Sequence, residues 1–303
     1  MSRYVEKAKS KQKISGEDFK GYFAPEGIEG AINLLEEYGD QVVIVAGGTD
    51  LLVDYNERLY DLDGILDLKN IEKLSKINVK EDHIEIGAMV THTEIEKSAS
   101  LKEYLPILSQ AAADVGSPQI RNRGTIGGNV VTASPAGDLL PALLAYKAEF
   151  ELVSIKGKER VLAKDFFTGP KKAVITPEQL LTKIIIPKPK ETTFSVWKKV
   201  GKRKALAISS ITLALVIEFN QDNLISDARA CMGAVAPTPI EIKEFKSKLQ
   251  DKSIEQIDYQ KLGQIIADNI SPIDDIRGTE EYRRDTGRDI MISALKELNS
   301  NWR

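Results

Sequence analysis

The sequence is short of the two side chains that most often hold metals in redox proteins. It contains one cysteine, Cys231, and two histidines, His83 and His92, among 303 residues. A single cysteine excludes an internal disulfide and fits a reducing, cytoplasmic compartment. An iron–sulfur cluster needs about four cysteine or histidine ligands, and cysteine- or histidine-rich zinc sites need a similar set. Any redox chemistry in this chain is therefore expected to use an organic cofactor and no metal.

Long apolar runs and a strong net charge are also missing. The longest stretch that looks apolar runs from Ile208 to Phe219, and four polar residues interrupt it. A membrane-spanning helix needs about 20 apolar residues, so the sequence predicts none. The first 19 residues lack the apolar core and cleavage site of a secretory signal. With a formal net charge of −3, the chain has no overall field for nucleic acid or an anionic membrane. We expect a cytoplasmic protein with neither partner.

Three regions differ in their sequence pattern. Residues 1–18 form a basic extension. Residues 19–188 alternate short helices with short strands, in subdomains of about 19–75 and 76–188, and end near Pro187-Lys188-Pro189. Residues 191–303 begin with apolar side chains at a strict period of two, which predicts a half-buried antiparallel strand. Predicted helices at 241–249, 258–269 and 279–298 follow. The pattern predicts an α+β fold that ends in a three-stranded antiparallel sheet with a helical bundle.

The first chemically informative segment follows a predicted buried strand. The first glycine segment comprises Val45, Ala46, Gly47, Gly48, Thr49, Asp50 and Leu51. Consecutive glycines allow backbone amides to converge on an anion, and a short predicted helix adds its N-terminal dipole. The segment matches neither the Rossmann fingerprint nor the P-loop. It suits a diphosphate cradle, and a plain tight turn between strand and helix remains an alternative.

A second glycine segment spans residues 124–138. It combines glycines with small polar side chains; its candidate ligands are Thr125, Ile126, Gly127, Gly128, Asn129, Thr132, Ser134 and Asp138. Amides and hydroxyls both donate and accept, and Asp138 is placed to cap the predicted helix 138–146. This surface suits a polar, phosphorylated ligand, whereas the alternative is an ordered surface loop with Asp138 as an ordinary cap.

The order and spacing of these segments resemble the flavoprotein (medium) subunits of the molybdenum hydroxylases, the family of xanthine, carbon monoxide and nicotinate dehydrogenases. Further similar motifs are Tyr22-Phe23-Ala24-Pro25, residues 117–122, residues 233–239 and Arg277-Gly278-Thr279. The resemblance covers all but about the first 20 residues. It implies an FAD-binding region with two subdomains, of the vanillyl-alcohol-oxidase (PCMH) type, ahead of the C-terminal domain.

The resemblance also implies roles for single residues. Residues 46–51 would bind the FAD diphosphate through backbone amides, and residues of the second segment would line the flavin and its linker. Asp138 would bind the adenosine end, Leu180 or Leu181 would pack on the flavin ring, and Lys198 would lie near it. A cation there would stabilise the reduced, anionic flavin. The alternative for Lys198 is a solvated strand lysine.

Other tempting side chains carry weaker hypotheses. His92 is interpreted as structural or solvent-facing, Cys231 as a small buried hydrophobe, and Trp197 as core. Arg283 and Arg284 are interpreted as residues of the surface or of a subunit contact. Thr91 and Glu94 have the spacing of a helix capping box.

The resemblance implies a function shared with other chains. A large subunit would carry molybdopterin, a small subunit would carry [2Fe-2S] clusters, and FAD in this chain would pass their electrons to NAD or another acceptor. Some family members hold an extra four-iron cluster in this subunit, but this chain lacks cysteines there, so FAD alone is expected. Two alternatives stay open: a stand-alone flavin oxidoreductase and a flavin-free nucleotide-binding scaffold.

Overall fold

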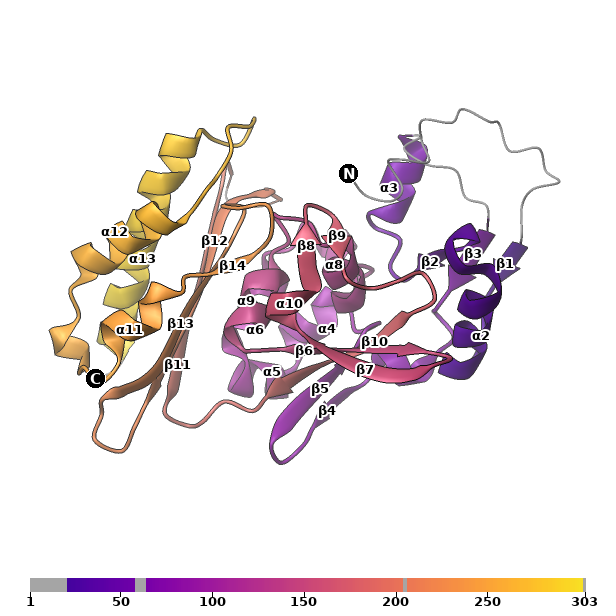
Figure 1. Cartoon of the computed structure of the whole chain (residues 1–303), viewed down its shortest axis with the longest axis horizontal. Helices are drawn as coiled ribbons and strands as arrows, with labels where there is room; N and C mark the ends of the chain where they lie inside the picture. Colours follow the sequence, from indigo (N-terminus) through magenta and orange to yellow (C-terminus); the bar gives the residue numbers. More distant parts are fainter. Residues whose placement is uncertain (1–20, 58–63, 204–205, 302–303) are drawn as a thin grey trace. The chain divides into compact units, whose positions relative to one another are not determined.

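A computed structural model of the chain describes residues 21–57, 64–203 and 206–301 (Figure 1). The predicted basic extension, residues 1–18, lies outside this part. The chain divides into two compact units, and each is described by itself. Unit 1 contains residues up to Glu94, Pro118–Ser134 and Glu149–Ile186, and unit 2 contains Ile95–Ser117, Pro135–Ala148 and the residues from Pro187 onward.

Unit 1 contains two main sheets and short helices. Its strands are β1 (Gly21–Phe23), β2 (Val43–Val45), β3 (Gly64–Asp67), β4 (Ile77–Val79), β5 (His83–Gly87), β6 (Glu149–Ser154), β7 (Gly157–Leu162), β8 (Phe167–Gly169), β9 (Lys172–Ala173) and β10 (Leu180–Pro187). Its helices are α2 (Ile28–Tyr38), α3 (Leu51–Asn56), α7 (Pro118–Arg121), α8 (Ile126–Thr132) and α10 (Ala163–Phe166), and α4 (His92–Lys97) begins in it. Short 3₁₀ turns lie at Gly39–Gln41 and Glu72–Ser75.

The first sheet of unit 1 is parallel and small. Its strand order is β1-β3-β2, and Val45 at the end of β2 lies opposite Asp67 at the end of β3. Helix α2 buries Ala31, Ile32 and Leu35, which lie at helical spacing. Because carboxyl ends of parallel strands share one edge, the first glycine segment begins at that edge of the sheet.

The second sheet of unit 1 has the order β4-β5-β10-β6-β7. The predicted hairpin around Lys80-Glu81-Asp82 is confirmed, since β4 and β5 pair antiparallel with Ile77 opposite Ile86. The predicted capping box before α4 is also confirmed. The Thr91 backbone N–H donates to Glu94 Oε2 at 2.7 Å, and the Glu94 N–H donates to Thr91 Oγ1 at 3.2 Å.

Unit 2 is a sheet between two helical layers. Its strands are β11 (Thr193–Gly201), β12 (Ser209–Phe219), β13 (Ile225–Gly233) and the two-residue β14 (Ile240–Glu241), paired antiparallel in that order. Its helices are α5 (Ala99–Tyr104), α6 (Pro106–Ala113), α9 (Leu139–Ala145), α11 (Glu244–Leu249), α12 (Tyr259–Asn269) and α13 (Glu280–Asn301), with a 3₁₀ turn at Ile254–Gln256. The predicted α+β class with a C-terminal antiparallel sheet is confirmed, and β14 adds a short fourth strand.

Strand β12 is buried on both faces, which corrects the expectation of a half-buried strand. Ile211, Leu213 and Leu215 are fully buried, and so are Thr212 and Ala214 between them. The residues of the period-two pattern lie on one face of β12, and they pack in one hydrophobic core with the C-terminal helices. Helix α9, which has the apolar sequence LLPALLA, covers the other face. Thr212 and Ala214 on that face are therefore buried, although neither is strongly apolar.

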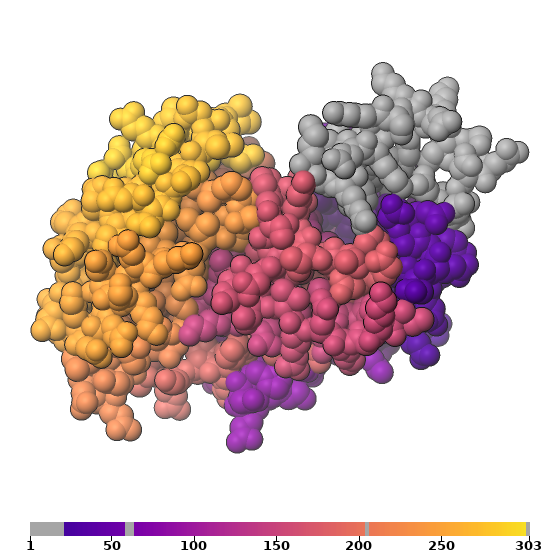
Figure 2. Space-filling model, viewed as in Figure 1, coloured from indigo at the N-terminus to yellow at the C-terminus, as the bar shows by residue number. Residues whose placement is uncertain are grey.

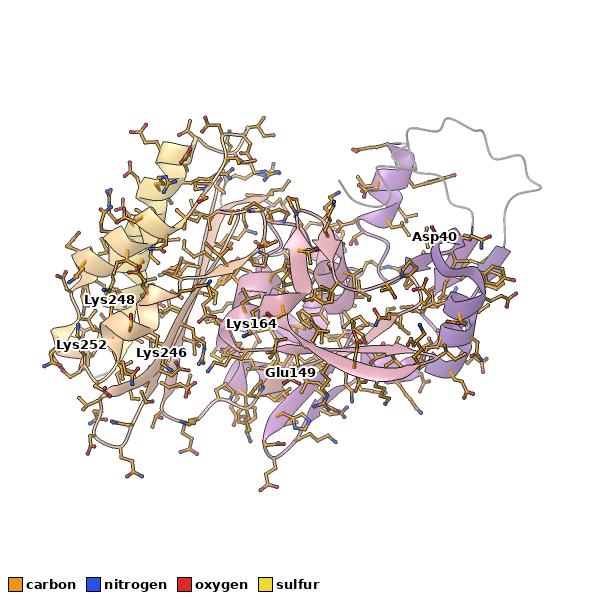
Figure 3. The ribbon with its side chains drawn as sticks, in the orientation of Figure 1. Asp40, Glu149, Lys164, Lys246, Lys248 and Lys252 are labelled. Atoms are coloured by element: carbon orange, nitrogen blue, oxygen red, sulfur yellow. The ribbon has the colours of Figure 1, made fainter. Side chains whose placement is uncertain are left out.

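The C-terminal helices form the outer layer of unit 2. They are coloured orange to yellow in the space-filling view, where they make up a continuous part of the surface (Figure 2). Lys246 and Lys248 belong to α11, which Figure 3 draws with its side chains. Within the described residues, no helix has the length and apolar character needed to cross a membrane.

Candidate functional site

The first glycine segment is a tight connection from β2 to α3. Gly48 has a φ of +73°, a value that favours glycine, and its carbonyl accepts the N–H of Leu52 at 3.1 Å. Among the residues that the structure describes, none accepts a hydrogen bond from the amides of Gly47, Gly48 or Thr49. These amides are therefore free to donate to a ligand, and the binding of an anion there stays a prediction.

The two glycine segments lie against each other. A Cβ atom placed on Gly47 would come within 2.0 Å of the Arg123 carbonyl oxygen and 2.9 Å of Gly124 Cα. Real side chains do not tolerate such distances, so Gly47 is required for the approach. A hydrogen bond from Thr132 Oγ1 to Asp50 Oδ2, at 3.2 Å, joins the segments a second time. Residues about eighty positions apart in sequence thus form one continuous surface in unit 1.

Half of the second segment is a helix, which corrects its interpretation as a loop. Helix α8 begins after Thr125, whose side chain accepts the Gly128 N–H at 3.1 Å. Gly127 lies against Ala88, the residue that follows β5, since its Cβ would be 2.6 Å from the Ala88 carbonyl oxygen. Glycine disfavours helices by about 1 kcal/mol, and the close backbone contact explains why glycine is nevertheless found here.

The amides of α8 already have partners within the protein. The Gly127 N–H donates to Ala88 O at 2.9 Å, the Gly128 N–H to Thr125 Oγ1, and the Asn129 N–H to Thr125 O at 3.0 Å. Among the described residues, unpaired backbone donors of the two segments therefore belong to the first segment, and the second contributes side chains beside them. Asn129 Oδ1 is buried with no hydrogen-bond partner. Buried amide oxygens are normally hydrogen-bonded, so Asn129 Oδ1 is a candidate acceptor for a ligand's donor group.

Asp138 occupies a buried ionic cluster in unit 2. Its Oδ2 accepts from Lys199 Nζ at 2.7 Å, and its Oδ1 accepts from Ser209 Oγ at 2.5 Å. Lys199 Nζ also donates to the carbonyl oxygen of Asp114, at 2.7 Å. Burial raises the pKa of Asp138 above its ordinary value, although Lys199 and Ser209 oppose that rise. The side chain makes no cap bond to α9, so the expected capping role of Asp138 is wrong.

Strand parity separates the two adjacent lysines of β11. Lys198 forms an ion pair with Glu297 of α13, on the face of the sheet that the C-terminal helices cover. Lys199 lies on the other face against Asp138, and only 11% of its side chain is exposed. Lys198 is the lysine that the sequence predicted for the site, and Lys199 was not predicted. The signal available was the alternation of side chains along β11, which places Trp197 and Lys199 on one face and Lys198 on the other. On that shared face, Trp197 Nε1 donates to Asp114 Oδ2 at 2.8 Å.

The remaining predicted residues have mixed environments. Leu180 and Leu181 are 2% and 4% exposed, and Leu180 belongs to the core of unit 1. Their contact with a flavin stays a prediction. His92 is buried, and burial followed by the charge of Arg121 lowers its pKa to about 4. It is therefore neutral at pH 7, as expected of a structural histidine. Within the described residues, no group of three histidine, cysteine or acidic side chains is arranged to hold a metal.

Two other interpretations are settled by burial. Cys231 is fully buried and Trp197 is 8% exposed, which confirms both as core residues. Arg283 is 2% exposed, so its assignment to the surface is wrong. Its guanidinium donates to Ala234 O and Asp275 Oδ1, and these hydrogen bonds offset the cost of removing its charge from water.

Comparison with known proteins gives a consistent result along the chain. Residues 15–189 match the family described as the FAD binding domain in molybdopterin dehydrogenase, and residues 197–298 match the CO dehydrogenase flavoprotein C-terminal domain. The nicotinate dehydrogenase FAD-subunit of Eubacterium barkeri is 32% identical over 93% of this chain and 96% of its own length. The xanthine dehydrogenase FAD-binding subunit of Escherichia coli O157:H7 is 30% identical over 88% and 91%. A chain of the reconstituted CO dehydrogenase from Oligotropha carboxidovorans superposes with a TM-score of 0.86 at 27% identity, covering 94% of this chain and 98% of that one.

Proposed function

Because the chain belongs to the family of FAD-binding domains in molybdopterin dehydrogenases, we propose that it is the electron-transfer subunit of a molybdenum hydroxylase complex. In this proposal, a small partner subunit with [2Fe-2S] clusters supplies the electrons, and a large molybdopterin subunit oxidises the organic substrate. NAD or another acceptor receives the electrons. Bound FAD supplies the redox chemistry, and the residues of this chain hold and orient it.

The observation that carries the proposal is the close approach of the two glycine segments. Gly47 meets the Arg123 carbonyl where no other residue fits, and free amides of Gly47, Gly48 and Thr49 lie beside that contact. Those amides would bind the diphosphate of FAD, and the turn would exclude bulkier groups from it. Asn129 Oδ1, buried and without a partner, would accept a hydrogen bond from the cofactor. These features fit a flavin dinucleotide.

The other predicted ligands have supporting roles in the proposal. Thr132 and Ser134 would add hydroxyls along the linker, and Asp138, kept in place by Lys199 and Ser209, would bind the adenosine end. Lys199, which lies on the same face of β11 as the Asp138 cluster, is a better candidate for a cofactor-side cation than Lys198. The sequence-based domain boundaries at residues 19–188 and 191–303 stay predictions.

Purification of the full chain tests the proposal directly. We expect a yellow protein that releases about one FAD per chain on denaturation and contains neither iron nor molybdenum. Substrate oxidation is expected only after the large and small subunits are added. A colourless protein that fails to bind added FAD would favour a flavin-free scaffold. Oxidation of an organic substrate by the isolated chain would favour a stand-alone flavin oxidoreductase.

A further inference from the structure

The first glycine segment offers amides to an anion but contains no cation of its own. Residues 45–51 include one charged side chain, Asp50, which is negative. Asp54 adds a second negative charge four residues further on, in α3. A diphosphate placed beside these carboxylates would be repelled, because like charges disfavour each other at short range. A diphosphate site at this segment therefore calls for a cation from another part of unit 1.

Arg123 is a cationic residue whose backbone contacts Gly47. Its carbonyl carbon would lie 2.7 Å from a Cβ atom placed on Gly47, and its carbonyl oxygen 2.0 Å. The Cα atom of Arg123 is bonded to that carbonyl carbon, so its side chain starts beside the free amides of the first glycine segment. Guanidinium groups match the geometry of phosphate oxygens, to which they can donate two parallel N–H bonds. Arg123 thus brings a suitable group to this place.

The backbone that carries Arg123 is held on both sides. The Arg123 N–H donates to the carbonyl oxygen of Ile120 at 3.1 Å, and the carbonyl oxygen of Gly124 accepts the His92 N–H at 3.0 Å. The ring of His92 packs on Gly124 as well, since a Cβ there would come within 3.0 Å of His92 Cδ2. The side chain of Arg123 therefore extends from a fixed point, and a ligand need not order the backbone beneath it.

The charge of Arg123 is not balanced within the part of the chain that the structure describes. Its side chain is exposed, and no described residue accepts a hydrogen bond from its guanidinium or forms an ion pair with it. Lys171 also lies near the glycine segments, because its N–H donates to Ala133 O at 2.9 Å. Its Nζ, however, lies 3.7 Å from Asp54 Oδ2, so a carboxylate already balances its charge. Of these two cations, Arg123 is the better candidate for a new anion.

We propose that Arg123 binds the diphosphate of FAD and supplies the positive charge that the first glycine segment lacks. This inference rests on the proposed function and adds to it a residue that the sequence did not indicate. The amides of Gly47, Gly48 and Thr49 would set the position of the phosphates, and Arg123 would offset their charge. Ion pairs between exposed groups are screened by salt, so the contact predicts that FAD affinity falls as ionic strength rises.

FAD titration of the flavin-depleted full chain tests the role of Arg123. Arg123→Gln is expected to weaken FAD binding by about tenfold at low salt, because it removes hydrogen bonds to a charged group. Arg123→Lys keeps the charge and should recover part of the loss. Since the exposed side chain has no partner among the described residues, both variants should keep the urea midpoint of the wild type. Weaker FAD binding at unchanged stability distinguishes a ligand contact from a structural role.

The dependence on salt gives a second readout. Between ionic strengths of about 0.01 and 0.15 M, the wild type should lose FAD affinity more steeply than Arg123→Gln. The matched control is Arg160→Gln, which removes an arginine of the edge strand β7 that lies 3.8 Å from Glu149. It should follow the wild type in affinity and salt dependence. Lys171→Gln should weaken FAD binding less than Arg123→Gln does.

Three results would overturn the inference while the wild type still binds FAD and the proposed function stands. Arg123→Gln would bind FAD as tightly as the wild type at low salt, or Arg160→Gln would lose as much affinity, or the loss would occur in Lys171→Gln alone. A wild-type chain that binds no FAD would instead contradict the proposed function itself.

Discussion

At the scale of single residues, glycines allow close backbone contacts in the two glycine segments. Gly47 touches the Arg123 carbonyl and Gly127 touches the Ala88 carbonyl, at places where a Cβ would lie 2.0 and 2.6 Å from oxygen. In both cases the obstacle is backbone, which cannot rotate away as the end of a side chain can. The importance of these two glycines therefore comes from close approach, whereas Gly48 is required for its positive φ.

Gly47→Ala is predicted to separate the two segments. The added methyl group must displace Arg123, so we expect a loss of about 1–3 kcal/mol in the free energy of unfolding. FAD binding is expected to weaken by about tenfold or more, which corresponds to about 1.4 kcal/mol. Urea unfolding and FAD titration of the purified chain measure the two effects.

Gly27→Ala is the matched control for this substitution. Gly27 precedes α2, has an extended φ of −144°, and has no atom within 4 Å of its ideal Cβ. It should retain the FAD affinity of the wild type, although alanine is a poorer N-cap than glycine and can lower stability slightly. Equal FAD affinity in Gly47→Ala and Gly27→Ala would show that the contact with Arg123 has no part in cofactor binding.

Residue types alone indicated a candidate site, whose cofactor contacts stay predictions, but they could not assign neighbouring residues to faces. The sequence indicated Gly47, Gly48 and Asn129 because consecutive glycines and an amide suit a phosphorylated ligand, although a tight turn and an ordered loop were open alternatives. It could not choose between Lys198 and Lys199, because the two lysines lie on opposite faces of β11. Each one pairs with a carboxylate that comes from an element distant in the sequence. Glu297 and Asp138 lie 99 and 61 positions away, and only the folded sheet shows which lysine each one meets.

At the scale of elements, local signals were reliable and tertiary ones were not. The capping box of Thr91 and Glu94 and the hairpin of β4 and β5 involve residues close in sequence, so the pattern contains all the information needed. Helix α8 was missed because Gly127 and Gly128 argue against a helix. Its stability comes from Thr125 and from contact with the backbone of Ala88. The second buried face of β12 was missed because α9, which covers it, lies far away in the sequence.

Strand β13 contains an acid-sensitive ionic cluster. Burial raises the pKa of Asp227, but the hydrogen bond from Lys147 at 2.8 Å and the charges of Arg229 and Lys246 outweigh it. The pKa of Asp227 is lowered from 3.8 to about 2. A carboxyl group with a lowered pKa in the folded state stabilises the fold above its unfolded pKa, and that stabilisation is lost as the pH falls toward the folded pKa.

Between about pH 4 and pH 2, the wild-type chain is predicted to lose stability on the order of 1 kcal/mol through Asp227 alone, after screening by solvent. Asp227→Asn should be less stable near pH 6 and show a shallower decline over that interval. Urea unfolding at several pH values measures the difference. Asp222→Asn, which changes an exposed turn residue of the same unit, should follow the wild-type curve. Parallel curves for the wild type and Asp227→Asn would contradict the proposed role of this cluster.

At the scale of the whole molecule, cofactor binding and folding should be coupled. A ligand that binds only the folded state stabilises it by about 2.7 kcal/mol at a concentration of 100 times its Kd. FAD is therefore predicted to raise the melting temperature of the flavin-depleted chain by several degrees. FMN, which has no diphosphate and no adenosine, should raise it less, because it does not engage the amides of the first glycine segment. Differential scanning calorimetry with FAD, FMN and ADP measures this order, and equal shifts with FMN and FAD would exclude the diphosphate cradle.

The complete burial of Cys231 has a practical consequence for studying such a complex. Burial raises the pKa of this thiol well above its ordinary value, and the thiolate is the form that reacts. Maleimide reagents should therefore leave the folded wild-type chain unmodified. A cysteine introduced at Ile155 or Ile276 would then be the single labelled position. One fluorophore or spin label can thus be attached at a chosen position without first replacing the native cysteine.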